Sequence, residues 1–273
     1  MSESLNLPLV IEPDELEKLL GNPDLLLVDL SSPDQYRRAH VPGAVFVPFQ
    51  QTMAGVPPVA GGLPPVAHLQ QLLSAIGLTP EKTVVVYDDE GGGWAGRFIW
   101  LLDSVGHQRY AYLNGGIHGW LADGKQPQVE PASPVASEYT VSLNNACSVD
   151  KDYLINNYQR DDLVVWDARS AGEYLGTRVN ALKAGHIPGA KNYEWTRAMD
   201  RHRALKIRDH QTLINELQEC GISKDKEVIT HCQTHHRSGF TYLLGKILGF
   251  PGIKAYPGSW SEWGNDPDTP VEL

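Results

Sequence analysis

Short runs of apolar residues, many of them β-branched, alternate along the chain with segments of helical periodicity. The runs are apolar throughout rather than every second residue, so they predict strands buried on both faces of a parallel sheet. Helical patterns over residues 69–76 and 213–220 are each ended by a glycine, Gly77 and Gly221. The pattern therefore predicts an α/β protein with helices on both faces of its sheets. The strands are predicted at residues 25–30, 84–87, 163–166 and 228–230.

The second half of the chain repeats the first in the same order. His40–Ala44 and His186–Ala190 both read His-x-Pro-Gly-Ala, and an apolar strand ending in aspartate precedes each of them. A period of about 140 residues indicates two homologous domains rather than a solenoid of short repeats. We predict an N-terminal domain over residues 1–125, a proline-rich linker over 126–145 and a C-terminal domain over 146–273.

The formal charge is −10, from 33 acidic and 23 basic side chains, and no basic run interrupts this excess. Nucleic-acid phosphates would be repelled, so nucleic-acid binding is disfavoured. The first twenty residues are acidic rather than basic, and no apolar stretch reaches 18 residues, which predicts a cytoplasmic protein without a membrane span. An anionic substrate would need a local positive site in this chain.

Three cysteines are too few for a disulfide framework, so each is interpreted as a reduced thiol. Cys220 matches Ile76 of the first half, just before a helix-ending glycine, and is expected to be a small buried apolar residue. Cys147 has no base nearby and is expected to be inert. Cys232 is left as the candidate nucleophile.

Cys232 heads a loop between a predicted strand, residues 227–231, and a predicted helix, residues 239–248. The carboxyl ends of parallel strands are where ligands bind, and the next helix offers free N–H groups and the positive end of its dipole. These groups, with Arg237 and the neighbouring histidines, should lower the thiol pKa. The loop is therefore predicted to bind an anion.

Two other interpretations of this loop remain open. The cysteine could simply be small and buried at a strand end. Zinc could bind His231, Cys232, His235 and His236, but no second Cys/His cluster at ligand spacing completes such a site, so metal is disfavoured.

The two-unit layout, the repeated His-x-Pro-Gly-Ala segment and a cysteine-headed loop in the second half only resemble the tandem-domain rhodaneses, the thiosulfate sulfurtransferases. The resemblance covers the whole chain, and the loop Cys-Gln-Thr-His-His-Arg is similar to that of certain bacterial rhodaneses. It implies two rhodanese-like domains, the first of them inactive, because Asp88 stands where the second has Cys232.

By the same resemblance, Cys232 takes the sulfane sulfur of thiosulfate as a persulfide and passes it to cyanide or another thiophilic acceptor, such as a thiol or an acceptor protein, in a ping-pong reaction. No cofactor or metal is implied, and a monomer would suffice. Asp167 is expected to pair with Arg237 and support the loop. The residues expected to bind substrate are Gln233, Thr234, His235, His236, Arg237 and Trp195.

Alternatives remain within and outside this family. Animal rhodaneses carry arginine where Glu173 stands, so positive charge must come from Arg237, the histidines, Arg178 or Lys183. A 3-mercaptopyruvate sulfurtransferase is one alternative, although these enzymes usually have a glycine-rich loop. A cysteine phosphatase of the same fold is less favoured, because its His-Cys-x5-Arg loop is one residue longer than the loop closed by Arg237. A non-catalytic binding module is a further alternative.

Overall fold

A computed structural model of the chain describes residues 5–273 and divides them into two compact units. Unit 1 comprises the described residues up to Thr52, together with Pro64–Asn144 and Met199–Ile207; unit 2 comprises Met53–Leu63, Asn145–Ala198 and Arg208–Leu273. Each half of the sequence therefore contributes one short segment to the unit formed mainly by the other half.

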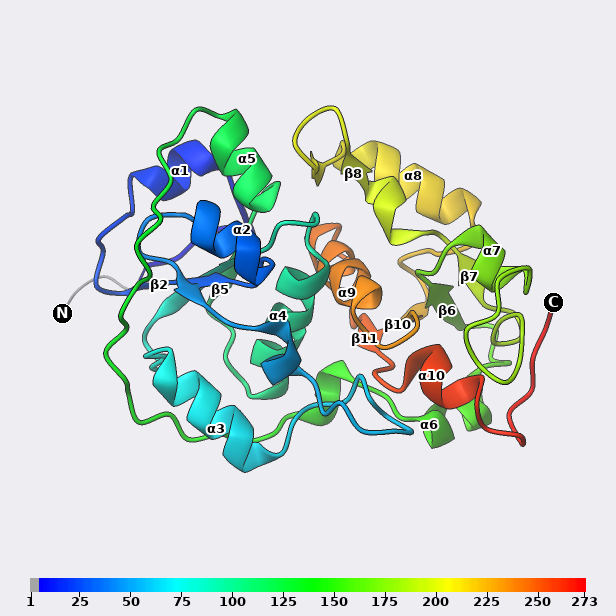
Figure 1. Cartoon of the computed structure of the whole chain (residues 1–273). Coiled ribbons are helices and arrows are strands. Elements are labelled where there is room, and N and C mark those ends of the chain that lie inside the picture. Colours follow the sequence, from blue (N-terminus) through cyan, green and yellow to red (C-terminus); the bar gives the residue numbers. More distant parts are fainter. Residues whose placement is uncertain (1–4) are drawn as a thin grey trace. The chain divides into compact units, whose positions relative to one another are not determined.

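Unit 1 is built on a five-stranded parallel sheet with the strand order β1-β5-β4-β2-β3 (Figure 1). One face of the sheet packs Leu27, Val85 and Ala111 against Leu16 of α1 and Trp120 of α5. The helices α3 and α4 lie against the opposite face. The elements are β1 (Val10–Ile11), α1 (Pro13–Glu17), β2 (Leu25–Asp29), α2 (Pro33–Arg38), β3 (Val45–Phe46), the 3-10 helix η1 (Phe49–Thr52), α3 (Val66–Ala75), β4 (Thr83–Tyr87), α4 (Gly93–Ser104), β5 (Tyr110–Leu113), α5 (Gly116–Ala122), β8 (Met199–Asp200) and β9 (Lys206–Ile207).

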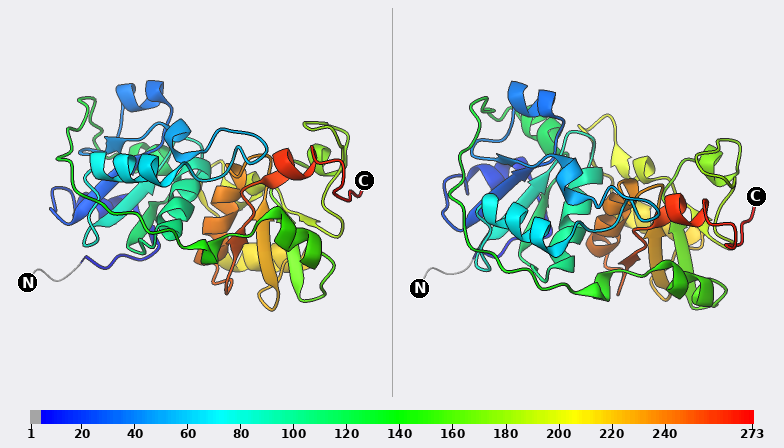
Figure 2. Two further views of the ribbon diagram at one scale, coloured as in Figure 1. Left: turned by 90° about the horizontal axis from the view of Figure 1, so that it is seen from below. Right: turned by 60° about the horizontal axis from the view of Figure 1, so that its bottom comes forward.

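Unit 2 repeats this plan with a four-stranded parallel sheet in the order β11-β10-β6-β7 (Figure 2). Leu163, Val165 and Ile229 pack against Leu154 of α6 and Trp260 of α10, and α8 and α9 cover the other face. The elements are η2 (Asn145–Cys147), α6 (Lys151–Asn157), β6 (Leu163–Asp167), α7 (Ala171–Tyr174), β7 (Lys191–Asn192), η3 (Trp195–Ala198), α8 (His210–Glu219), β10 (Glu227–His231), α9 (Arg237–Ile247), β11 (Lys254–Ala255) and α10 (Ser259–Trp263).

The predicted α/β class, with helices on both faces of each parallel sheet, is confirmed, and the four predicted strands appear as β2, β4, β6 and β10. The two glycine-ended helices are α3 and α8. Gly77 and Gly221 follow them with φ of 77° and 83°, a left-handed conformation that glycine adopts without a steric penalty. The other strands of the described residues were not among those predicted: β1, β3, β5, β7, β8, β9 and β11.

The hairpin formed by β8 and β9 comes from the second half of the sequence but packs within unit 1. Lys206 on β9 forms ion pairs with Glu12 and Asp123, at 3.0 and 2.8 Å. Asn114 accepts a hydrogen bond from the Ile207 N–H at 2.9 Å and donates one to the Glu12 carboxylate at 2.6 Å. Polar contacts therefore fasten this hairpin at the end of β5.

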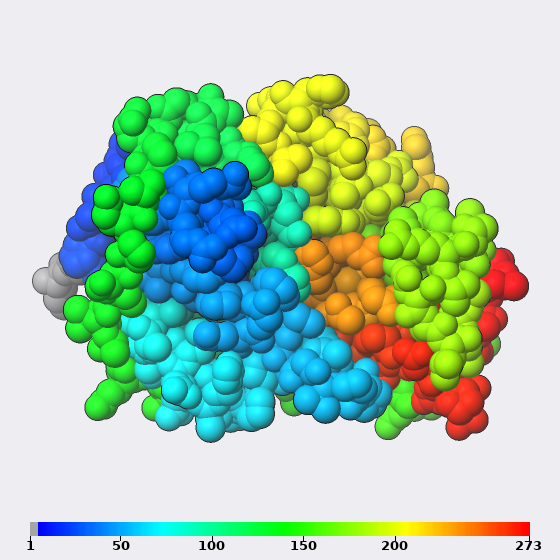
Figure 3. Space-filling view, in the orientation of Figure 1, coloured from blue at the N-terminus to red at the C-terminus, as the bar shows by residue number. Residues whose placement is uncertain are grey.

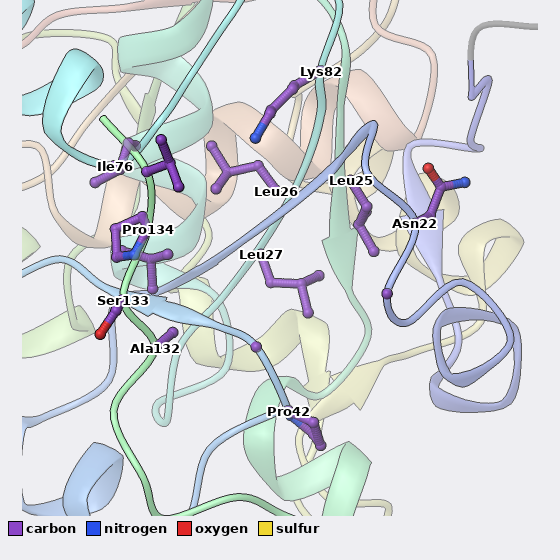
Figure 4. Close-up of a pocket in the computed structure, with 14 residues that line it drawn as sticks. Asn22, Leu25, Leu26, Leu27, Pro42, Ile76, Lys82, Ala132, Ser133 and Pro134 are labelled. Carbon is purple, nitrogen blue, oxygen red and sulfur yellow. The ribbon is translucent and has the colours of Figure 1, made fainter. Parts of the chain in front are cut away.

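A cavity of about 410 Å³ lies in unit 1 beside the start of β2 (Figure 4). Leu25–Leu27 form one wall, residues 132–135 another, and Lys82 is the one charged side chain among the described residues that line it. No cysteine is among the described residues that line this cavity, and none of the Cys232 loop residues lines it, so it is not the predicted site. Within residues 5–273, no helix is both long and apolar enough to cross a membrane.

Replacing Asn114 by alanine should loosen the hairpin, because the Ile207 N–H loses its acceptor at a cost of about 1–3 kcal/mol. We expect trypsin to cleave the exposed Arg201 and Arg203 faster than in the wild type, as followed by mass spectrometry of the fragments. Asn156→Ala, which removes a bond within α6 only, is the matched control. Equal cleavage rates in the two variants would contradict the role of Asn114 in fastening the β8–β9 hairpin.

Candidate active site

Cys232 directly follows β10, an inner strand of the sheet of unit 2, and the loop it begins ends where α9 starts (Figure 1). The residue is 1% exposed. Its side chain therefore lies at the carboxyl end of a central strand, beside the free N–H groups of a helix of three turns. The predicted location of the nucleophile is the one the fold produces.

Hydrogen bonds to the Ser259 side chain and from the Trp260 backbone, at the start of α10, hold the loop in place. The Ser259 hydroxyl accepts from the N–H groups of Cys232 and His235, at 3.4 and 3.1 Å, and the Trp260 N–H donates to the Cys232 carbonyl at 2.9 Å. His235 has φ of 54°, a left-handed conformation that is unfavourable for a residue with a side chain. No sequence pattern predicted Ser259 as a site residue, because it lies 27 residues from Cys232 along the chain.

Ser238 contacts the sulfur and was not among the predicted site residues. Its hydroxyl donates to Cys232 Sγ at 3.4 Å and lies 2.8 Å from Nδ1 of His235. A hydroxyl has one proton, so if it donates to sulfur it must accept from His235 Nδ1–H. His235 is fully buried and faces Ser238. In this geometry it orients the donor to sulfur, whereas the sequence predicted that it binds substrate.

The environment of Cys232 favours the thiolate. Burial by itself raises the pKa of the thiol, but the charge of Arg237, the hydrogen bonds from Ser238 and the charge of His236 together hold the pKa below its ordinary value. The N-terminus of α9 acts in the same direction. The site can therefore hold an anionic sulfur out of water.

The expected ion pair between Arg237 and Asp167 is wrong. Arg237 instead makes a bidentate pair with Glu173, at 2.7 and 2.9 Å. Burial raises the pKa of Glu173, but Arg237 more than compensates and lowers it to about 2. Arg237 is the first residue of α9, and its side chain reaches the short helix α7 rather than the end of β6. Glu173 thus neutralises the cation that closes the loop.

Asp167 pairs with a different arginine, Arg169, through three contacts of 2.6 to 3.0 Å. Both side chains are buried. The Arg169 guanidinium lies 4.4 Å from the ring centre of Trp260. The backbone N–H of Trp260 donates a hydrogen bond to the Cys232 carbonyl. Asp167 is therefore connected to the loop through Arg169 and Trp260, and the spacing of two residues between Asp167 and Arg169 was a signal that could have been used.

The other predicted loop residues are only partly buried. Gln233 donates to the Asn180 carbonyl at 3.2 Å, and the Asn180 side chain donates to Glu173 at 3.0 Å. In Figure 3 the yellow-green segment around residue 180 lies beside the orange segment that contains this loop. The second and last residues of the loop, Gln233 and Arg237, are thus tied to one network. Thr234 lies between them and is half-buried.

Trp195, at the start of η3, is half-buried and lies next to His236, with ring centres 5.7 Å apart. The structure therefore brings the predicted aromatic residue to the loop. Of the two other cations considered, Lys183 is bound to the carbonyl groups of Pro267 and Thr269, and Arg178 is exposed.

His231 precedes the nucleophile and is fully buried. Burial lowers its pKa to about 4, although Asp167 lies 3.6 Å away and acts in the opposite direction. The ring is therefore neutral near pH 7. Within residues 5–273, no three His, Cys, Asp or Glu side chains are grouped as metal ligands.

Cys147 and Cys220 are free thiols, as Cys232 is. Cys220 caps the end of α8 and is half-buried, so the expectation of a buried apolar residue is wrong for this position.

Unit 1 has the corresponding loop after β4, with Asp88 in place of Cys232. The buried Asp88 carboxylate accepts hydrogen bonds of 2.8 to 3.1 Å from the N–H groups of Glu90, Gly91, Gly92 and Ala95. Burial and the charge of Glu90 raise its pKa to about 6. A built-in carboxylate therefore occupies the anion cradle of unit 1.

Ser238→Ala should raise the thiol pKa by about one to two units, since a hydrogen bond to a charged group contributes about 1.5–3 kcal/mol. The pH dependence of Cys232 alkylation by iodoacetamide measures this pKa, because the thiolate is the form that reacts. The control is Thr241→Val, which removes a buried hydroxyl bonded to the Ser238 carbonyl rather than to sulfur. An unchanged profile in Ser238→Ala would contradict the assigned contact.

Asp88 should make unit 1 less stable as the pH rises. A carboxyl whose pKa is raised by folding favours the folded state when protonated, so its contribution is present below about pH 4 and is lost as the pH passes about 6. Asp88→Asn has no such titration. Urea unfolding between pH 4 and 7 should show wild-type stability falling relative to the variant by at most about 3 kcal/mol. A constant difference would contradict the raised pKa.

Known proteins are similar to this chain over its full length. The chain is 55% identical to a thiosulfate sulfurtransferase of Pseudomonas aeruginosa and 53% identical to one of Azotobacter vinelandii, over the full length of all three proteins. It is 28% identical to the sulfur carrier protein TtuD of Thermus thermophilus, over 96% of this chain and 95% of that protein.

Solved structures share the fold. The anaerobic ergothioneine biosynthesis enzyme of Chlorobium limicola, in complex with trimethyl histidine, superposes with a TM-score of 0.86 at 21% identity, over 97% of this chain and 70% of that one. The family model described as "Rhodanese-like domain" matches residues 12–123 and again residues 150–266. The protein therefore belongs to the rhodanese family and contains two copies of the rhodanese-like domain.

Proposed function

We propose that the protein is a thiosulfate sulfurtransferase that uses Cys232 as its nucleophile. The observation that carries this proposal is the buried Cys232 thiol, whose pKa is lowered by Arg237 and Ser238 at the start of α9. Relatives more than half identical over their full length are named thiosulfate sulfurtransferase, which supports the same activity.

The reaction proceeds in two displacements. The Cys232 thiolate attacks the outer sulfur of thiosulfate; the S–S bond of thiosulfate breaks, sulfite leaves with the bonding pair, and a persulfide anion remains on Cys232. Cyanide then attacks the outer sulfur of the persulfide and leaves as thiocyanate, which returns the thiolate. No net oxidation or proton transfer is required, so the protein needs only to stabilise anionic sulfur.

Hydrogen-bond donors that are already in place in the loop stabilise the anionic sulfur. The Ser238 hydroxyl already donates to Sγ, and the N-terminus of α9 lies beside it. Such donors stabilise developing negative charge without reorganising during the reaction. In unit 1, the loop N–H groups that bind Asp88 illustrate the same capacity for an anion.

The geometry disfavours the phosphatase alternative. Arg237 closes a short loop and its guanidinium is held by both oxygens of Glu173, so it is not free to bind a phosphoryl group. Hydrolysis of an aryl phosphate that is lost in Cys232→Ala would overturn the sulfurtransferase proposal. A donor such as 3-mercaptopyruvate needs no different nucleophile and is distinguished by comparing the two donors directly.

The proposal includes small-molecule partners, thiosulfate as donor and cyanide, a thiol or an acceptor protein as acceptor. It also includes action as a monomer in the cytoplasm, in accord with three cysteines that are all free thiols.

Thiosulfate treatment should add about 32 Da to the protein, on the peptide that contains Cys232, because one sulfur atom is transferred. Intact-mass and peptide mass spectrometry measure the addition, and cyanide should remove it with formation of one thiocyanate per site. Cys232→Ala should show neither event, whereas Cys147→Ser and Cys220→Ser should behave as the wild type. No adduct on the wild-type protein would refute the proposal.

A further inference from the structure

A short turn from the first half of the sequence lies within unit 2. The turn, residues Met53–Leu63, connects η1 to α3, two elements of unit 1, yet it clusters with unit 2. It is closed by its own backbone: Ala54 N–H donates to Gly62, Gly55 N–H to Ala60 and Gly62 N–H to Val59, at 2.9 to 3.0 Å. Internal bonds of this kind give the turn a defined shape.

Gly61 is the point at which this turn meets the catalytic loop. It is buried, and a Cβ built on it would lie 2.4 Å from the carbonyl oxygen of Thr234 and 2.5 Å from that of Pro257. Both neighbours are backbone atoms, which cannot rotate away as a side-chain end can. No residue other than glycine fits this position without moving one of the two segments.

The two carbonyl groups belong to segments in unfavourable conformations. His235, which follows Thr234, and Ser259, which follows Pro257 by two residues, both have φ of 54°. They are joined by the His235 N–H, which donates to the Ser259 hydroxyl at 3.1 Å. Such conformations persist only when their surroundings hold them. Gly61 lies against the backbone of both segments and limits their movement toward the turn.

We propose that Gly61 is a positioning residue for the catalytic loop, and that the first half of the chain thereby completes the active site of the second. The turn keeps the Thr234 peptide in the position that places His235, and through His235 the Ser238 hydroxyl, against Cys232. The half that lacks a nucleophile is therefore required for the reactivity of Cys232. This inference rests on the proposed function only where sulfur transfer is measured.

The test is Gly61→Ala in the full-length protein. The added methyl should displace the Thr234 peptide, raise the Cys232 pKa by about one unit and slow persulfide formation from thiosulfate about tenfold. Alkylation by iodoacetamide as a function of pH measures the pKa, and rapid-quench mass spectrometry measures persulfide formation. A purely structural role would lower the melting temperature without moving the alkylation profile.

Gly62→Ala is the matched control. Its Cβ would contact Val59 and Ala54, all within the same turn, and the nearest of these atoms is 3.1 Å away. We expect a wild-type alkylation profile for this variant even if its melting temperature falls. A Gly61→Ala variant with the wild-type pKa and rate would overturn the inference, as would an equal shift in pKa for both variants.

Val59→Ala provides a second route if Gly61→Ala does not fold. Val59 lines a cavity of about 320 Å³ together with Tyr256, Pro257 and Gly258. Its truncation to alanine therefore weakens the packing of the turn against residues 256–258 without a steric overlap. A smaller rise of the Cys232 pKa is expected, and no rise would contradict the inference.

The two proposals fail separately. If the wild-type protein forms no persulfide but Gly61→Ala still raises the thiol pKa, the sulfurtransferase proposal fails and the positioning role stands. If the wild type transfers sulfur and neither Gly61→Ala nor Val59→Ala changes the pKa, the positioning role fails alone.

Discussion

Burial of an anionic sulfur is the constraint on which the architecture of unit 2 depends. A thiolate that is 1% exposed loses its hydration, and burial alone raises its pKa. The chain compensates with the charge of Arg237, the hydroxyl of Ser238 and the N-terminus of α9. These groups converge because β10 ends beside the start of α9, and the loop between them is too short to place the sulfur elsewhere.

Unit 1 meets the same constraint with a different anion. The strand, loop and helix are retained, but the Asp88 carboxylate fills the cradle and satisfies four loop N–H groups. The carboxylate occupies the cradle of unit 1, at the position where unit 2 has the Cys232 thiol. Unit 1 therefore keeps the strand, loop and helix without a thiol, because the Asp88 carboxylate gives the buried N–H groups an acceptor.

The arrangement of charge around Cys232 explains how a chain of net charge −10 accommodates an anion. Glu173 forms an ion pair with Arg237, and Asp167 forms one with Arg169, so each arginine is paired with a carboxylate. Stabilisation of the sulfur depends on groups at short range, which are the charge of Arg237, the hydrogen bonds from Ser238 and the N-terminus of α9. These are little affected by the overall charge of the protein.

The sequence by itself determined the fold class, the repeat, four of the inner strands (β2, β4, β6 and β10) and the position of Cys232. Each of these depends on local periodicity or on the order of residues along one strand and loop. Only the tertiary structure showed which residues contact one another around the catalytic loop. Arg237 reaches Glu173 rather than Asp167, Ser259 holds the loop from 27 residues away, and Gly61 meets Thr234 from the other half of the chain. Two residues interact when the fold brings them close in space, and the sequence records only their separation along the chain.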